Sequence, residues 1–184
     1  MKISRLSLPQ YLDRLGRDER AVSAVEFAML LPLMLTLYLG TVEVSRAVGI
    51  DRKVTITAHT VADLASQVST IGDTDMSNIL TAAQAVIQPY DTNMLRVTVS
   101  GVQIDNNGTA KVAWSDTLNG TARSVGSGVT VPATLNSPNS FLIWSEVSYN
   151  YVPIIGYVIT GPMTLSDQLY MGPRLGNSVA RTHP

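Results

Sequence analysis

The sequence predicts an α+β fold, in which a long N-terminal helix and a second, shorter helix precede a small antiparallel sheet. Three observations support this prediction. An apolar run near the N-terminus continues into apolar residues at helical spacing, and a second amphipathic segment follows it. The pattern then changes to alternating apolar and polar residues around a turn signal. Helices that come first and strands that come later are typical of an α+β domain.

With 184 residues, the chain has room for one domain and an anchor. We divide it into a leader over residues 1–21, a transmembrane segment over residues 22–44 and an α+β domain over residues 45–184. The leader mixes charged residues with Pro9 and Gly16, so no core of its own is expected there.

The apolar run is long enough to cross a membrane. No charged residue lies between Phe27 and Val42, and about 20 mostly apolar residues span a bilayer. Basic residues precede the run, and such a flank normally stays on the cytoplasmic side. We therefore expect the N-terminus inside and the following domain outside. The predicted transmembrane residues include Phe27, Leu30, Leu31, Pro32, Leu33, Leu35, Leu37 and Leu39.

Glu26 is the unusual residue in this segment, because an ionised carboxylate is costly to remove from water. It would lie roughly 7 Å into a helix counted from Ala21, at about 1.5 Å per residue. One interpretation is that its side chain reaches back to the lipid headgroups. The other is a function, since acidic residues in membrane segments are rare and usually mark one.

A cleaved secretory signal is the main alternative for the apolar run, because a basic region before an apolar stretch also describes one. Signal peptidases need small residues one and three positions before the cut. Tyr38 makes the pattern poor around Gly40, whereas Ala47-Val48-Gly49 satisfies it and predicts a mature chain that begins at Ile50.

The helical spacing continues beyond Gly40 and predicts a helix to about Thr70, with Gly72 as its stop. Counted from Val22, this helix would be roughly 70 Å long. Its apolar stripe comprises Val44, Ala47, Val48, Val54, Ala58, Val61, Ala65 and Val68. Polar residues fall mostly off the stripe: Glu43, Arg46, Arg52, His59, Asp63 and Gln67.

A second helix is predicted over residues 73–90, with Asp75 or Ser77 as its cap and Pro89 as its end. Its expected apolar face comprises Ile79, Leu80, Ala83, Val86 and Ile87.

Alternating residues predict the strands. A strand over residues 95–105 leads to the turn signal Asn106-Asn107-Gly108, and residues 109–115 return as its partner. Residues 119–139 are rich in turn formers and predict a long surface loop, with a short strand at 129–131. The strongest strand pattern covers residues 141–152, and the last predicted strand covers residues 165–171.

Composition and motifs do not indicate catalysis. The chain has no cysteine, which excludes disulfides and thiolate metal sites, and its net charge of −1 gives no sign of nucleic-acid binding. His59 and Asp63 are four residues apart on a predicted helix, but no third metal ligand is evident. We therefore expect no catalytic residues, no metal, no cofactor and no enzymatic activity. An aromatic set could form either a binding platform or the core of a thin sheet, and its members are Trp114, Trp144, Tyr149 and Tyr151.

Two blocks around the apolar run resemble a known family. They are Ala-Val-Ser-Ala-Val-Glu-Phe-Ala-Met-Leu-Leu-Pro-Leu, beginning at Ala21, and Gly-Thr-Val-Glu-Val-Ser-Arg, beginning at Gly40. They resemble the N-terminal signature of TadE/TadG-like pilus assembly proteins, the pseudopilins of tight-adherence (type IVc) pilus systems. Residues 144–153 and 172–179 extend the resemblance.

The resemblance implies cleavage by a prepilin peptidase five residues before the glutamate, between Ala21 and Val22. Glu26 would then be the fifth residue of the mature chain, and the resemblance implies that it pairs with the free amine of Val22 in the same or an adjacent subunit. Such peptidases prefer glycine where this chain has Ala21. Gly16 would place Ala21, not a glutamate, at the fifth position.

The function implied by the resemblance is that of a minor pilin or pseudopilin, a structural or assembly subunit in pilus biogenesis and surface adhesion. Its partners would be other pilins, pilus assembly-platform proteins and the prepilin peptidase. It would cross the inner membrane once, with a periplasmic domain, or be incorporated in an extracellular pilus. The short periplasmic part favours a TadE-like over a TadG-like role. The alternative is a single-pass, membrane-anchored periplasmic protein that binds a partner or ligand and does not enter a filament.

Overall fold

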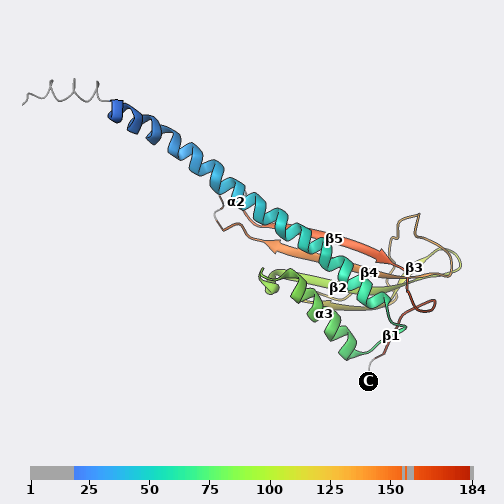
Figure 1. Cartoon of the computed structure of the whole chain (residues 1–184). Helices are drawn as coiled ribbons and strands as arrows, with labels where there is room; N and C mark the ends of the chain where they lie inside the picture. The colour runs from blue at the N-terminus through green and yellow to red at the C-terminus, as the bar shows by residue number, and fades with distance from the viewer. Residues whose placement is uncertain (1–18, 155, 157–159, 183–184) are drawn as a thin grey trace, which may run out of the picture. The chain divides into compact units, whose positions relative to one another are not determined.

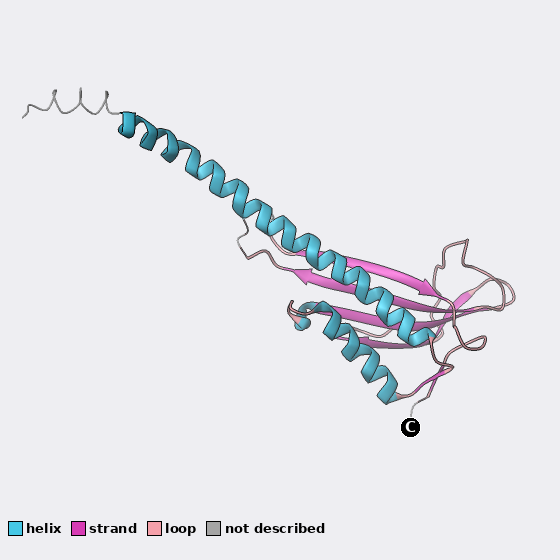
Figure 2. Cartoon of the chain, viewed as in Figure 1, coloured by secondary structure: helices cyan, strands magenta, loops and turns pink. Residues whose placement is uncertain are grey.

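The computed structural model describes residues 19–154, 156 and 160–182 and has the predicted α+β fold (Figures 1 and 2). Most of the predicted leader lies outside these residues. The helices are α2 (Glu19–Ser66), α3 (Asp73–Ile87) and the short 3₁₀ helix η1 (Thr92–Met94). The long strands are β2 (Leu95–Ile104), β3 (Ala110–Leu118), β4 (Phe141–Tyr151) and β5 (Met163–Met171). Two strands have two residues each, β1 (Thr70–Ile71) and β6 (Ala180–Arg181).

The chain divides into two compact units. The first comprises residues 1–44 and 154–160, and the second comprises residues 45–153 and 161–184. The boundary crosses α2, so the first part of this helix belongs to one unit and the second part to the other.

In the second unit, four strands form an antiparallel sheet with the order β3-β2-β4-β5. Figure 2 shows α3 and the second part of α2 lying across the same face of this sheet, which we call the inner face. Lys53 Nζ on α2 donates a hydrogen bond of 2.7 Å to the Val86 carbonyl near the end of α3. Apolar side chains of α2 are fully or almost fully buried, which places a hydrophobic core between helices and sheet; they are Ala47, Ile50, Val54, Ala58, Val61, Ala62 and Ala65.

A β-bulge gives the sheet a second, smaller core on its outer face. The β2–β3 register shifts after Gly101, so that Gly101 lies opposite Trp114 and Val102 lies opposite Val112. The extra residue on β3 reverses the alternation of its side chains. Gly101 has no side chain where Trp114 packs, since a Cβ there would lie 2.4 Å from the indole Nε1. The smaller core comprises Val102, Ile104, Ala110, Val131, Leu142 and Trp144.

The parallel pair β1–β6 closes the second unit. Arg181 on β6 has only 6% of its side chain exposed and forms ion pairs with Asp116 at 2.9 Å and Asp73 at 2.6 Å. The hydrogen bond with Asp116 is the main cause that raises the pKa of Arg181. This arrangement joins α3, β3 and β6. The sequence pattern predicted neither β1 nor β6, because two residues are too few to show alternation.

The helix boundaries differ from the prediction at one junction. The predicted end of the long helix at Thr70 is wrong, because α2 ends at Ser66 and β1 follows. Gly72 is the N-cap of α3, and the Asp75 carboxylate accepts a hydrogen bond from the Gly72 N–H at 3.0 Å. Asp75 therefore caps α3 from inside its first turn, and α3 ends at Ile87 instead of residue 90.

The predicted burial pattern of the helices is partly wrong. Val44 and Val48 are about half exposed, whereas Glu43 is buried, with 3% of its surface exposed. In α3 the buried side chains are Met76, Ile79, Ala83 and Ile87, while Leu80 and Val86 are only partly buried. A prediction from spacings of three and four does not take into account which parts of the fold lie beside each turn of the helix.

The strand predictions hold with small shifts. β2 and β3 form the predicted hairpin, and β4 and β5 follow. At the turn, the Asp105 carboxylate accepts hydrogen bonds of 2.8 Å from the N–H groups of Asn107 and Thr109. The short strand predicted at 129–131 is wrong, since only an isolated bridge between Lys111 and Gly128 forms there.

Candidate functional site

The first part of α2 presents apolar side chains to its surroundings on all sides. Among the described residues, α2 is the only helix that is long and apolar enough to cross a membrane. A helix that is apolar all round needs a lipid or protein environment, because water does not favour such a surface. The large hydrophobic residues exposed here are Val22, Val25, Phe27, Met29, Leu30, Leu31, Leu33, Met34, Leu35, Leu37, Tyr38 and Val42.

The residues predicted to lie in the membrane all fall within this part of α2. Most of them are exposed, and Leu39 is partly buried. Pro32 lies inside the helix without breaking it, and the Thr36 hydroxyl donates a hydrogen bond of 2.8 Å to the Pro32 carbonyl. That the membrane surrounds these residues stays a prediction.

The residues of the predicted processing site lie near the start of α2. Ala21 and Val22 are helical, and Glu26 is exposed one turn later. Residues four apart in a helix lie on the same face, so Glu26 is directed towards the turn that contains Val22. Among the described residues, the Glu26 carboxylate forms no hydrogen bond or ion pair. Cleavage and pairing of Glu26 with a cation stay predictions.

Glu43 is a second acidic residue of the first unit, and its role was not predicted from the sequence. Its Oε1 accepts a hydrogen bond of 2.8 Å from the Gly156 N–H in the β4–β5 connection. Gly156 has φ = +66°, a conformation that favours glycine. The signal available in the sequence was that Glu43 is the first charged residue after the apolar run.

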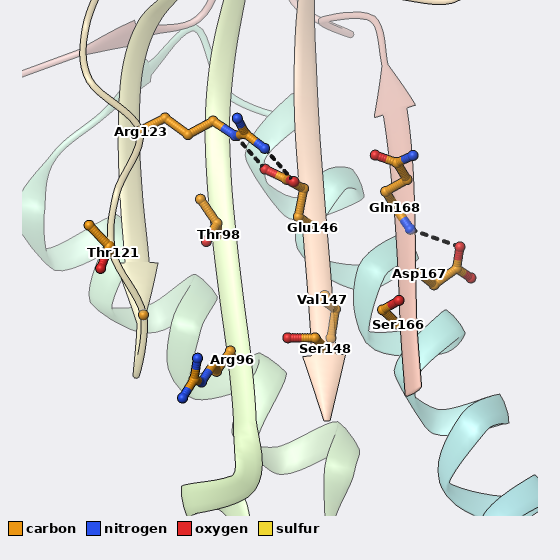
Figure 3. A pocket seen from close by; sticks show the side chains of 11 residues that line it. Arg96, Thr98, Thr121, Arg123, Glu146, Val147, Ser148, Ser166, Asp167 and Gln168 are labelled. Atoms are coloured by element: carbon orange, nitrogen blue, oxygen red, sulfur yellow. Dashed lines mark hydrogen bonds and ion pairs between the residues drawn. The ribbon is translucent and has the colours of Figure 1, made fainter. Parts of the chain in front are cut away.

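The outer face of the sheet carries a polar groove with a volume of about 860 Å³ (Figure 3). The strand register places Thr98, Glu146 and Gln168 side by side on β2, β4 and β5. Local sequence patterns do not indicate this groove, because its residues come from three strands and a loop. They are Arg96, Thr98, Gly120, Thr121, Arg123, Glu146, Val147, Ser148, Ser166, Asp167 and Gln168.

Arg123 attaches the long loop to the groove. Its guanidinium donates two hydrogen bonds of 2.7 Å to the Glu146 carboxylate and lies 4.0 Å from the centre of the Trp144 ring. The hydrogen bond with Glu146 is the main cause that raises the pKa of Arg123. A bidentate ion pair that also stacks on an aromatic ring fixes the side chain in one geometry.

The aromatic residues form core contacts and no open platform. Trp144 stacks on Tyr170 with a centroid distance of 5.3 Å, and Arg123 covers it. Burial is the largest cause that raises the pKa of Tyr170. Trp114 donates a buried hydrogen bond of 2.8 Å to the Val179 carbonyl. Trp114, Trp144, Tyr149 and Tyr151 are all buried, which confirms the core interpretation.

The pair His59 and Asp63 does not form a ligand set. Asp63 is bound by Arg174 and by the Gln67 side chain, while His59 is exposed. Within the described part of the chain, no group of three or more metal-ligating side chains comes together.

Comparison with known families finds a similarity in the N-terminal helix. A family model described as "TadE-like protein" matches residues 21–63. No curated protein and no solved structure matched the chain. The matched residues begin at the predicted processing site and include the exposed apolar part of α2, Glu26 and Glu43. The resemblance inferred from the residues around Glu26 is therefore confirmed over residues 21–63, which are similar to this family and which we call the TadE-like segment.

Proposed function

We propose that this protein is a minor pilin or pseudopilin, a membrane-anchored subunit of a type IVc pilus that acts in pilus biogenesis and surface adhesion. The observation that supports this role is the exposed apolar surface of α2 inside the TadE-like segment. The proposed partners are other pilins, pilus assembly-platform proteins and a prepilin peptidase.

The physical basis of the proposal is that the first part of α2 can exchange one apolar environment for another. In the inner membrane its side chains contact lipid, and in a filament they would contact the helices of neighbouring subunits. The apolar surface stays out of water in both places, so transfer does not expose it. This helix can therefore serve both as an anchor before assembly and as a packing surface afterwards.

Glu26 provides the specificity in this proposal. In a helical bundle its carboxylate needs a cation, and cleavage after Ala21 creates one at the amine of Val22. Removing one partner of a buried ion pair is costly, so the pair would favour the axial register in which every carboxylate has an amine.

Three observations support retention of α2 in the mature protein over cleavage as a secretory signal. The helix continues without a break through Gly49, and Ile50 is buried within the second unit. The TadE-like match also extends across this position. A cut before Ile50 would remove the first part of the matched segment.

The test is mass spectrometry of the mature N-terminus of the protein isolated from its own cells. We expect the chain to begin at Val22. An N-terminus at Ile50 would contradict the proposal and indicate a signal peptide. An N-terminus at Met1 would favour the second candidate.

The second candidate is a single-pass anchored protein whose outer domain binds a partner or ligand without entering a filament. The polar groove on the outer face of the sheet favours it, because Arg96 and several hydroxyl groups there face open space. Recovery of the protein only from membranes, and never from purified pili, would support this candidate over the first.

A further inference from the structure

One row of side chains in the outer groove carries polar groups that the domain itself does not use. The strand register places Arg96, Ser148 and Ser166 side by side on β2, β4 and β5, in the row next to that of Thr98 (Figure 3). Neighbouring strands are about 4.8 Å apart, so the row is about 10 Å long. Among the described residues, none of the three side chains in this row forms a hydrogen bond or ion pair. They are therefore available to a ligand.

The other charged groups of the groove already have partners. Both carboxylate oxygens of Glu146 accept hydrogen bonds of 2.7 Å from Arg123. The Asp167 carboxylate accepts a hydrogen bond of 2.8 Å from the Gln168 N–H, and Figure 3 shows it directed away from Arg96. Among the described residues that line the groove, Arg96 is the cation without a carboxylate. An anion should therefore bind at the row of Arg96.

The rest of the lining favours a ligand with many hydroxyl groups. The Trp144 indole donates a hydrogen bond of 3.1 Å to Gln168 Oε1, so the NH₂ group of that amide is the part left for a ligand. The loop adds the exposed hydroxyl of Thr121. Val147 is the one large apolar residue in the described lining, and it is buried. The groove thus offers hydrogen-bonding groups but no pocket for an apolar side chain.

The wall of the groove is held in place without a ligand. The Asn119 side chain donates hydrogen bonds of 3.1 Å and 3.0 Å to the carbonyls of Thr92 and Leu95. Further along the loop, the Arg123 N–H donates a hydrogen bond of 3.1 Å to Ser115 Oγ. A site that is already ordered loses less entropy on binding. The groove volume of about 860 Å³ lies within the range of about 300–1,000 Å³ that is typical of small-molecule sites.

We propose that this groove binds an acidic sugar unit of a polysaccharide, with the sugar carboxylate on Arg96 and the ring hydroxyls on Ser148 and Ser166. A guanidinium matches the planar geometry of a carboxylate. Serine hydroxyls both donate and accept hydrogen bonds, as sugar hydroxyls do. An acidic peptide is the less suitable ligand, because its apolar side chains would find no pocket.

This inference goes beyond the proposed function and does not depend on entry into a filament. All the residues that line the groove belong to the second unit, whereas the proposed assembly surface is the first part of α2. A failure of the sugar site would leave the assembly role intact. An N-terminus at Met1 would leave the sugar site intact.

The test is calorimetric titration of the full chain with trigalacturonate, in a polyoxyethylene detergent whose headgroup carries neither sugar nor charge. The matched probe is the methyl ester of the same trisaccharide, which keeps the sugar hydroxyls but removes the charges. Arg96→Gln should weaken binding of trigalacturonate by about 10- to 100-fold, the usual effect of losing a hydrogen bond to a charged group. Ser148→Ala should weaken it by about 2- to 10-fold.

Arg52→Gln is the matched control, because it removes an exposed cation from α2 and should leave the affinity unchanged. An equal loss with Arg52→Gln and Arg96→Gln would show attraction to the overall charge and refute the site. Equal binding of the acid and its ester would refute the contact between carboxylate and Arg96. Tighter binding of triglutamate than of trigalacturonate would identify an acidic peptide as the ligand and overturn the proposal, as would no binding of trigalacturonate.

A separate measurement excludes a folding defect. Arg96 is exposed, so its replacement removes no buried contact. Trp114 and Trp144 both lie in the sheet, so an unchanged tryptophan emission spectrum without ligand verifies the fold of each variant.

Discussion

The two parts of α2 share one helix but differ in what surrounds their apolar side chains. In the first part, Leu33 is 58% exposed and its neighbours on every side of the helix are also apolar. In the second part, Val54 is completely buried, while Arg52 and His59 lie on the exposed side. The distribution of apolar residues around the helix therefore decides whether a segment packs on its own domain or needs an external partner.

This difference predicts that a new aspartate changes a different property in each part of α2: stability in the second part and membrane insertion in the first. These are the largest effects that we expect. Val54→Asp places a carboxylate in the core without a cation, which should lower the free energy of unfolding by about 3–5 kcal/mol. Leu33→Asp should leave the free energy of unfolding unchanged, but make membrane insertion less favourable by about 3 kcal/mol.

The free energy of unfolding of both variants can be measured on the full chain in detergent micelles, by guanidinium denaturation followed through tryptophan fluorescence. The two tryptophans lie in the sheet, so this signal reports on the second unit. Membrane fractionation measures the effect of each variant on membrane insertion. Equal destabilisation by the two variants would show that the first part of α2 also contributes to the core of the domain.

The acidic residues of the two parts provide a second test. Glu26→Ala should leave membrane insertion and the denaturation midpoint unchanged but strongly reduce the number of pili, since it removes the proposed partner of the Val22 amine. Asp51→Ala is the matched control, because Asp51 is an exposed acid in the second part of α2. Electron microscopy of cells that express each variant measures the number of pili per cell. Normal piliation with Glu26→Ala would remove Glu26 from the assembly mechanism.

The smallest effect that we predict concerns the contact between the second part of α2 and α3. Lys53 Nζ binds the Val86 carbonyl at the C-terminal end of α3, where the helix dipole also favours a cation. Lys53→Met should lower the free energy of unfolding by about 1–2 kcal/mol. Arg52→Met changes an exposed cation on the same helix and should have an effect below about 0.5 kcal/mol. If the two variants were equivalent, the hydrogen bond would not contribute to the docking of α2.

The sequence was sufficient to predict the elements that depend on local patterns. The apolar run and the helical spacing gave α2, and the alternation around Asn107-Gly108 gave the β2–β3 hairpin. The junction after Ser66 was not predictable in the same way. Gly72 fits a helix stop and an N-cap equally well by residue type, and the partner of β1 lies more than a hundred residues away in β6.

The candidate sites differ in the same way, because some consist of contiguous residues and others of residues that only the fold brings together. The residues around Glu26 are contiguous, so a local motif is enough to identify them. The groove requires Arg123 from a loop beside Glu146 and Gln168 from two strands, and only the strand register brings them together. The role of Glu43 depends on a glycine in the β4–β5 connection, which no local pattern indicates.

The closure of the second unit by β6 has a consequence for the order of events in the cell. β1 is made early, yet within the described residues it pairs only with β6, and the ion pairs of Arg181 with Asp73 and Asp116 form at the same place. Contacts between residues so far apart in the chain are slow to form, because closing the long loop between them costs entropy. The domain therefore cannot acquire all its native contacts while residues 180–181 are still inside the ribosome. It completes them only after residues 180–181 have left the ribosome and reached the same compartment as the rest of the domain.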